Sequence, residues 1–166
     1  MDHSAEILIS ATPETVWTVL ADTESYSSFD PGIARIIGGP LMPDRFAPEV
    51  NRRGEEVRLR PVRLLFFSME DGDRGRVFRV TEFSPPRWMV WTERAPFGLV
   101  LRERSFLLEA GRSGTLFRLT QETTGRLARF AARWEPGLDE AFQRFCTGVR
   151  DMAEALEAVK RERRGR

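Results

Sequence analysis

The sequence has very few of the residues that form covalent links and metal centres. Its 166 residues include one cysteine, Cys146, and one histidine, His3. A single cysteine excludes a disulfide within the chain, and a single histidine excludes a multi-histidine metal site. Because His3 stands at the N-terminus, where we expect a frayed end, a histidine-based catalytic triad is not expected either. The sequence therefore predicts no bound metal and no cofactor, and it suits a reducing cytoplasm.

Neither an excess of charge nor a long apolar run is present. The 26 basic residues nearly balance 25 acidic ones, so no bulk field favours nucleic acid. No stretch of eighteen apolar residues occurs, and the N-terminus lacks a basic region followed by an apolar one. We expect a soluble, unexported cytoplasmic protein that neither inserts stably into membranes nor binds nucleic acid.

A long amphipathic helix is the strongest pattern in the chain, and it covers Pro136–Val159. Apolar residues recur at spacings of three and four, and charged residues fill the opposite side. About six turns give a helix of roughly 35 Å, too long for one neighbouring helix in a chain of this length to cover. A curved antiparallel sheet is the natural partner. The apolar positions are Leu138, Phe142, Phe145, Val149, Met152, Leu156 and Val159, and the charged ones are Asp139, Glu140, Arg144, Arg150, Asp151, Glu154 and Glu157.

The chain before this helix reads as one short strand, two short helices and a series of further strands. Ala5–Ser10 alternates like a strand, Thr12 and Pro13 begin a first helix, and Asp22–Ser28 forms a second. The remaining expected strands are Ile33–Gly38, a strand interrupted at Pro61 between residues 56 and 69, and two hairpins, 76–83 with 88–94 and 99–110 with 115–124. Residues 41–54 are expected to form a long loop, and the charged end after Val159 a frayed tail. The length suits a single domain, 1–166.

Five segments in this order resemble the START-like (SRPBCC) superfamily, and within it the polyketide cyclase/dehydrase-type members. They are TPETVWTVLADTESYSSFDPGI, GGPLMP, FRVTEFSPPRWMVW, RSFLLEAGRSGTLFRLTQETTG and the final helix. The resemblance spans nearly the whole chain. Two departures are Phe29, where the family often has Trp, and the long arginine-rich segment 44–75.

The resemblance implies an α+β helix-grip fold. A seven-stranded curved antiparallel sheet would wrap around the C-terminal helix, with two short helices after the first strand. A hydrophobic cavity would lie between sheet and helix, where family members hold lipids, sterols, quinones or polyketides and some catalyse cyclisation or dehydration. A fold narrows the type of ligand without fixing the reaction.

Strand parity predicts which polar groups face this cavity. If Met89 and Trp91 point inward, Glu93 on the same strand does so too. On the next strand, inward-facing Phe106 and Leu108 imply that Arg104 and Arg102 face inward. On the last strand, inward-facing Phe117 and Leu119 imply the same for Gln121. In one interpretation Arg104 orients a carbonyl, carboxylate or enolate of the ligand, while Glu93 holds or balances the guanidinium. In the other, these charges form a structural ion pair at the rim of the sheet. The expected ligand-binding residues are Tyr26, Phe78, Met89, Trp91, Glu93, Arg104, Phe106, Phe117, Gln121, Phe142 and Phe145.

Five positions have both a functional and a structural interpretation. Tyr26 could donate a hydrogen bond to a ligand or pack as an amphipathic side chain. Cys146 is expected to be a buried, inert thiol. Arg126, Arg129 and Arg133 recur at helical spacing and could bind phosphate or an acidic partner, or form a solvated face.

Three functional classes remain open from the sequence. The first is a protein that binds an apolar small molecule, favoured because the expected cavity is rich in apolar side chains and poor in acid–base groups. The second is an enzyme of the cyclase or dehydratase type, in which Glu93, Arg104 and Tyr26 would move protons and stabilise an enolate. The third is a co-chaperone-like interaction module that uses its outer surface. The oligomeric state is not determined by these patterns.

Overall fold

The computed structural model describes residues 2–30, 48–50, 56–58, 64–67, 76–95, 97, 99–131 and 137–165. Within 48–79, and at Glu24, Ser27 and Ala131, only the backbone is described. The helices are α1 (Pro13–Ala21), the 3-10 helix η1 (Thr23–Ser25), α2 (Tyr26–Phe29), α3 (Ala128–Ala131) and α4 (Leu138–Arg164). The strands are β1 (Asp2–Ile9), β2 (Pro48–Val50), β3 (Glu56–Arg58), β4 (Leu64–Phe67), β5 (Arg76–Ser84), β6 (Trp88–Arg94), β7 (Leu101–Gly111) and β8 (Gly114–Thr124).

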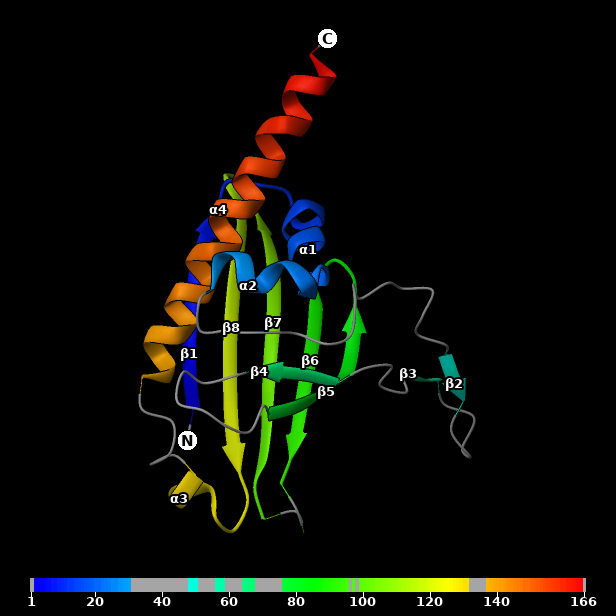
Figure 1. The fold of residues 1–166 in the computed structure, drawn as a ribbon. Helices are drawn as coiled ribbons and strands as arrows, with labels where there is room; N and C mark the ends of the chain where they lie inside the picture. Colours follow the sequence, from blue (N-terminus) through cyan, green and yellow to red (C-terminus); the bar gives the residue numbers. More distant parts are fainter. Residues whose placement is uncertain are drawn as a thin grey trace.

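The main sheet is antiparallel, with the strand order β1-β8-β7-β6-β5-β4 (Figure 1). Three hairpins of consecutive strands, β5–β6, β6–β7 and β7–β8, build its centre, and the first strand closes one side by pairing with β8. The pairing of β5 with β6 shifts between Val80 and Glu82, which marks a β-bulge. A separate two-stranded sheet joins β2 to β3.

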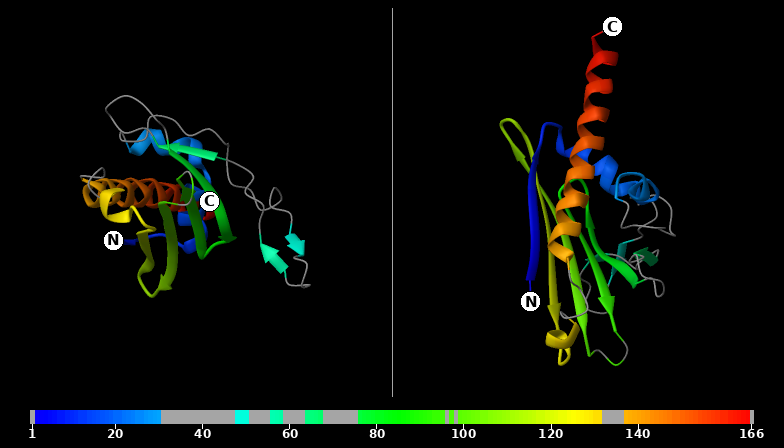
Figure 2. Two further views of the ribbon diagram at one scale, coloured as in Figure 1. Left: turned by 90° about the horizontal axis from the view of Figure 1, so that it is seen from below. Right: turned by 60° about the vertical axis from the view of Figure 1, so that its left-hand side comes forward.

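Helix α4 lies against one face of the sheet and runs beyond its end (Figures 1 and 2). It packs along β1, and α1 and α2 contact it from the other side. Acidic residues in its first turn and arginines in its last turn complement the helix dipole. Among the described helices, none has the length and apolar character needed to cross a membrane.

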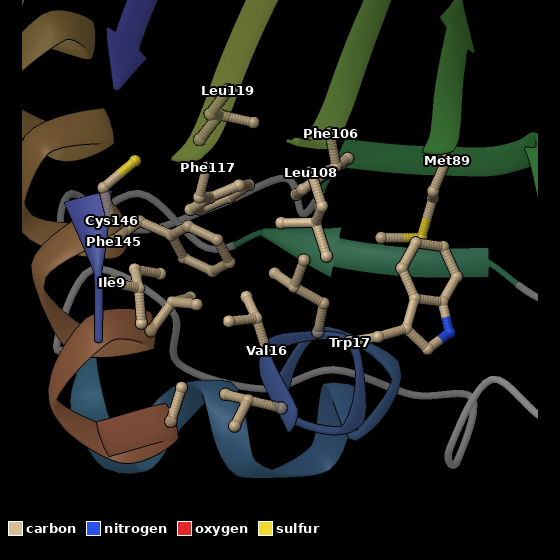
Figure 3. Close-up of a cluster of buried hydrophobic side chains, with 14 of the residues drawn as sticks. Ile9, Val16, Trp17, Met89, Phe106, Leu108, Phe117, Leu119, Phe145 and Cys146 are labelled. Carbon is tan, nitrogen blue, oxygen red and sulfur yellow. The ribbon is translucent and has the colours of Figure 1, made fainter. Parts of the chain in front are cut away.

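The core lies between α4 and the inner face of the sheet (Figure 3). Along β7 and β8 every second side chain is buried, as a strand with one covered face requires. Helix α1 completes this core with Val16, Trp17 and Leu20, and it begins where the side chain of Thr12 accepts a hydrogen bond from the backbone amide of Thr15.

The structure corrects four details of the sequence-based prediction. The end of the chain is not a frayed tail, because α4 stays helical to Arg164. Met152 and Val159, expected on the buried stripe, are 41% and 44% exposed, because the buried stripe of this part of α4 runs through Val149, Ala153 and Glu157 instead. Glu157, expected on the solvated side, is buried. His3 is part of β1, which begins three residues earlier than expected.

The expected count of seven strands is not confirmed. The main sheet has six described strands. Residues 33–38, expected to form the second strand, lie outside the described residues, and so does the interruption at 61. A strand, β2, falls within the region 41–54 that was expected to be a loop.

Candidate functional site

A row of polar side chains crosses the inner face of the sheet next to the apolar core. In β7 the buried positions are Arg102, Arg104, Phe106 and Leu108, and in β8 they are Thr115, Phe117, Leu119, Gln121 and Thr123. The strand registers set Trp91 opposite Arg104, Arg104 opposite Gln121, and Gln121 opposite His3. Aligned positions on neighbouring strands point to the same face. One aromatic and three polar residues therefore form a row across four strands.

Arg104 is held by two neighbours. Its Nε and Nη2 donate to Oε1 of Gln121 at 3.2 and 2.6 Å. Its guanidinium carbon lies 4.9 Å from the centre of the Phe142 ring, which α4 presents to the sheet. The guanidinium is thus directed from β7 toward β8 and lies against α4. Since a guanidinium has five donors in a planar fork, this is a group suited to bind a carbonyl or carboxylate oxygen.

An ion pair occupies the next row. Nη1 of Arg102 donates to Oε2 of Glu93 at 3.0 Å, and both side chains are largely buried, with 9% and 15% of their surface exposed. The two residues are register partners on β7 and β6. Glu93 and Arg102 thus form an ion pair, but a largely buried one, whereas the second interpretation of the sequence has an ion pair at the rim of the sheet.

His3 joins the polar row from β1. Its Nδ1 lies 2.8 Å from Oδ1 of Asp139 in the first turn of α4, and only 12% of its side chain is exposed. Sequence reasoning missed both residues because His3 was placed in a frayed end. A signal was available, since the strand parity that directs Ile7 and Ile9 inward also directs Ala5 and His3 inward.

The expected aromatic and sulfur-containing residues lie in one cluster. Trp91 and Phe106 have ring centres 4.5 Å apart, and Phe106 stacks on Phe117 at 6.4 Å. Phe145 from α4 meets Phe106 edge to face at 6.3 Å. Met89 is fully buried beside this group, as the register with Phe106 requires. Phe78 lies in β5, but its side chain is outside the described residues.

Tyr26 is buried at the start of α2. Its hydroxyl donates to the carbonyl of Leu20, and its ring stacks near Trp91 and meets Phe145 edge to face. Burial, with a contribution from Asp22, raises the pKa of this phenol well above its usual range. A role for Tyr26 in ligand binding stays a prediction.

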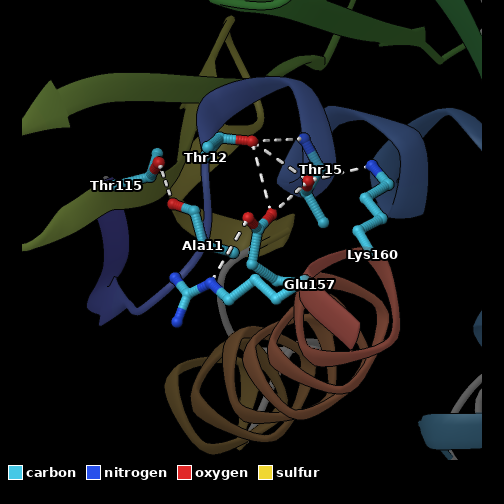
Figure 4. A network of polar contacts seen from close by, with 7 residues as sticks. Ala11, Thr12, Thr15, Thr115, Glu157 and Lys160 are labelled. Atoms are coloured by element: carbon cyan, nitrogen blue, oxygen red, sulfur yellow. Dashed lines mark hydrogen bonds and ion pairs between the residues drawn. The ribbon is translucent and has the colours of Figure 1, made fainter. Parts of the chain in front are cut away.

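A second polar cluster joins α4 to α1 (Figure 4). The carboxylate of Glu157 accepts hydrogen bonds from the hydroxyls of Thr15, at 2.5 Å, and Thr12, at 3.5 Å. Lys160 donates to the Thr15 hydroxyl at 3.0 Å, and Arg161 lies 3.8 Å from the carboxylate. The hydrogen bond from Thr15, a backbone bond at Thr12 and the two cations together lower the pKa of Glu157, despite the opposing effect of burial.

The described residues also include one thiol, one histidine and several acidic side chains. Cys146 is buried, and burial raises the pKa of its thiol to about 12, so the thiolate is scarce at neutral pH. In the part of the chain that the structure describes, no three histidine, cysteine or acidic side chains come together as a metal site would need. What the polar row offers is hydrogen bonding and acid–base chemistry.

Comparison with solved structures finds the same fold in other proteins. Protein MLL2253 from Mesorhizobium loti is 17% identical with a TM-score of 0.61, over 93% of this chain and 98% of that one. The Aha1 dimer from Colwellia psychrerythraea is 19% identical with a TM-score of 0.60, over 93% of this chain and 96% of that one. The di-domain ARO/CYC StfQ of the steffimycin biosynthetic pathway is 13% identical with a TM-score of 0.60, over 97% of this chain and 51% of that one.

Sequence comparison gives the family directly. No match was found among curated proteins. Residues 2–162, nearly the whole chain, match the family model described as polyketide cyclase / dehydrase and lipid transport. This agrees with the α+β architecture, in which an antiparallel sheet packs against a long C-terminal helix. The chain therefore belongs to the polyketide cyclase/dehydrase and lipid transport family of the START-like superfamily.

Proposed function

We propose that the whole chain, residues 1–166, is one ligand-binding domain that holds an apolar small molecule between the sheet and α4. The molecule is flat or elongated, of the lipid, sterol, quinone or polyketide type, and carries at least one oxygen that Arg104 binds. The observation that carries the proposal is the position of Arg104, a largely buried guanidinium in the row next to the aromatic cluster and against a ring of α4. The family description, which includes lipid transport, supports the same type of ligand.

The two kinds of group have separate roles in this proposal. Apolar burial supplies the affinity, at about 25 cal/mol for each Å² removed from water. The guanidinium fixes the orientation, because the N–H groups of its planar fork donate to an oxygen in only a few directions. The Glu93–Arg102 ion pair lies in the next row of the same face, so Arg102 already has a carboxylate partner there.

The test is a binding panel. Quinones, sterols, fatty acids and aromatic polyketides are added to the protein, and quenching of its four tryptophans is followed. For any ligand that binds, Arg104→Ala should weaken affinity by roughly 1.5 to 3 kcal/mol, the range for a hydrogen bond to a charged group. The matched control is Arg118→Ala, which removes an arginine from the outer face of β8, where it pairs with Glu6. Equal affinities for the two variants would contradict the proposed role of Arg104.

A polyketide cyclase or dehydratase activity at the same place is the second candidate. The family description names cyclase and dehydrase, and StfQ, which shares the fold, is described as an ARO/CYC protein. An enzyme would need an acid–base group near the bound oxygen, in addition to the guanidinium. A ligand recovered chemically unchanged after prolonged incubation would favour the binding function alone.

A further inference from the structure

One polar pair on the inner face has no part in the binding function proposed above. His3 on β1 and Asp139 at the start of α4 approach to 2.8 Å. The pair joins two segments 136 residues apart in the sequence, so it depends on the docking of α4 on β1. His3 is also the register partner of Gln121, the residue that binds Arg104. An imidazole and a guanidinium thus flank one amide side chain.

The contact with Asp139 fixes the tautomer of the neutral ring. An ionised carboxylate can only accept a hydrogen bond, so Nδ1 of His3 carries the proton that is donated. The lone pair is then on Nε2, and among the described residues no hydrogen bond to Nε2 is found. Most of the His3 side chain is covered by protein, whereas Asp139 is 69% exposed. A carboxylate thus orients an imidazole whose second nitrogen is a base, an arrangement that hydrolases use for proton transfer.

The spacing of the strands brings this base within reach of a ligand held by Arg104. Neighbouring strands lie about 5 Å apart, so His3 and Arg104 stand about 10 Å apart at the backbone. The guanidinium closes part of this gap, because Arg104 extends over β8 to Gln121. To reach Nε2 of His3, a carbonyl compound bound at the guanidinium would have to place its adjacent carbon over the Gln121 amide, which lies between the two groups. A proton on that carbon is acidic once the oxygen is hydrogen-bonded.

We propose that His3 is a catalytic base, positioned by Asp139, that enolises a carbonyl compound bound at Arg104. In this step Nε2 takes a proton from the carbon next to the carbonyl, and the electrons of the C–H bond form a C=C bond. The carbonyl electrons move onto oxygen, where the N–H groups of Arg104 stabilise the enolate. The proton returns from the imidazolium to carbon, so no other reactant is consumed. This inference rests on the proposed binding function and adds an activity to it.

Hydrogen exchange into a simple ketone tests the step. β-Tetralone, an apolar bicyclic ketone, is incubated with the protein in deuterium oxide, and loss of its α-proton signals is followed by proton NMR above the protein-free background. The wild type should accelerate exchange, and His3→Gln should lose about a hundredfold or more of that acceleration, the usual contribution of a general base. Asp139→Asn should lower the rate without weakening binding, because Asp139 acts only through His3.

Two controls separate chemistry from structure. Free imidazole should restore exchange to His3→Ala, which a purely structural role of His3 would not allow. Glu140 is exposed and lies next to Asp139 in the sequence, and Glu140→Gln should leave the exchange rate unchanged. If β-tetralone binds and His3→Gln exchanges it as fast as the wild type, the inference is wrong and the binding function stands. If β-tetralone quenches no tryptophan fluorescence and is not exchanged, the inference is wrong for a simple ketone, whereas the binding panel still decides the proposed binding function.

Discussion

The two ends of the contact between α4 and the rest of the protein use polar groups in different ways. Near the C-terminal part of α4, Glu157 receives hydrogen bonds from Thr12 and Thr15 at the start of α1. Near the beginning of α4, Asp139 meets His3, and Phe142 lies against Arg104. The first end brings donors to a buried acceptor. At the second end a guanidinium lies against an aromatic ring, and an imidazole contacts a mostly exposed carboxylate.

This difference separates a structural site from a candidate functional one. At the Glu157 end, hydroxyl groups, a backbone amide and two cations surround one carboxylate, and they lower its pKa. Such a network stabilises the ionised form and fixes α1 on α4. At the Arg104 end, the contacts of the guanidinium with Gln121 and Phe142 involve a neutral amide and an aromatic ring, not a carboxylate. A guanidinium has five donors, so an anionic or carbonyl oxygen can bind in addition to these contacts.

Removing the ring of Phe145 should have the largest effect on stability. Phe145 lies between the two ends, and its ring packs against Tyr26 and Phe106. Phe145→Ala should lower the free energy of unfolding by about 3 to 5 kcal/mol, the cost of a large cavity in a core. Urea denaturation measures this loss. Phe142→Ala is the comparison at the Arg104 end, where the ring contacts a guanidinium, and a larger loss there would contradict the expected order of the two variants.

Gly148→Ala should be destabilising although it adds a helix-favouring residue. An added Cβ at Gly148 would lie 2.3 Å from the ring of Phe29, so α2 and α4 would have to separate. Overpacking of this kind costs about 1 to 3 kcal/mol, which exceeds the gain of up to about 1 kcal/mol from helix propensity. Thermal unfolding compares the stability of Gly148→Ala with that of the double variant that combines Gly148→Ala and Phe29→Ala. Relief of the loss in the double variant is expected, and an unchanged or increased stability of the single variant would show that the contact is absent.

Glu157→Gln should destabilise the protein in a pH-dependent way. Because the folded state lowers the pKa of Glu157, the ionised carboxylate stabilises the fold at pH values above its ordinary range, and this contribution is lost as the pH falls through the folded-state pKa. We expect a loss of about 1 to 2 kcal/mol at neutral pH that disappears in acid. Urea denaturation across the pH range measures it, with the exposed Glu162→Gln as the control. A constant difference at all pH values would contradict the ionic origin.

His3→Gln should have the smallest effect on stability, within about 0.5 kcal/mol. Asp139 is mostly exposed, so solvent screens its interaction with His3. The same variant is expected to abolish most of the proposed exchange activity. A loss of more than about 2 kcal/mol in urea denaturation would mean that the pair stabilises the fold, as Glu157 does, and the contrast between the two ends would disappear.

The architecture could be predicted from the sequence because its patterns are periodic and long. The heptad-like spacing of apolar residues in α4, and the alternation in β7 and β8, repeat over enough positions to identify a helix and two strands. The same alternation predicted that Arg104 and Gln121 share a face with Phe106, and the burial of all three agrees. The ends of elements were less accurate. The run of charges at the C-terminus predicts a frayed tail, whereas these residues continue α4.

Contacts between distant segments could not be predicted in this way. Periodicity assigned Glu157 to the solvated side of α4, but it is buried, because α1 covers that part of the helix with its hydroxyl groups. His3 was discounted for its position in the chain, but the pairing of β1 with β8 gives it a partner in Gln121 and brings it to Asp139. The burial of Glu157 and the contact of His3 with Asp139 both depend on which segments of the chain pack together in the fold.

The sequence by itself determined the fold class, the family resemblance and which side chains of each strand share a face, because local periodicity and residue order carry that information. The tertiary structure alone decided that Glu93 pairs with Arg102, that Arg104 lies against Phe142, and that His3 meets Asp139. The physical reason is that hydrogen bonds and ion pairs form between groups a few ångströms apart in space. The distance between two residues in the sequence does not determine that separation.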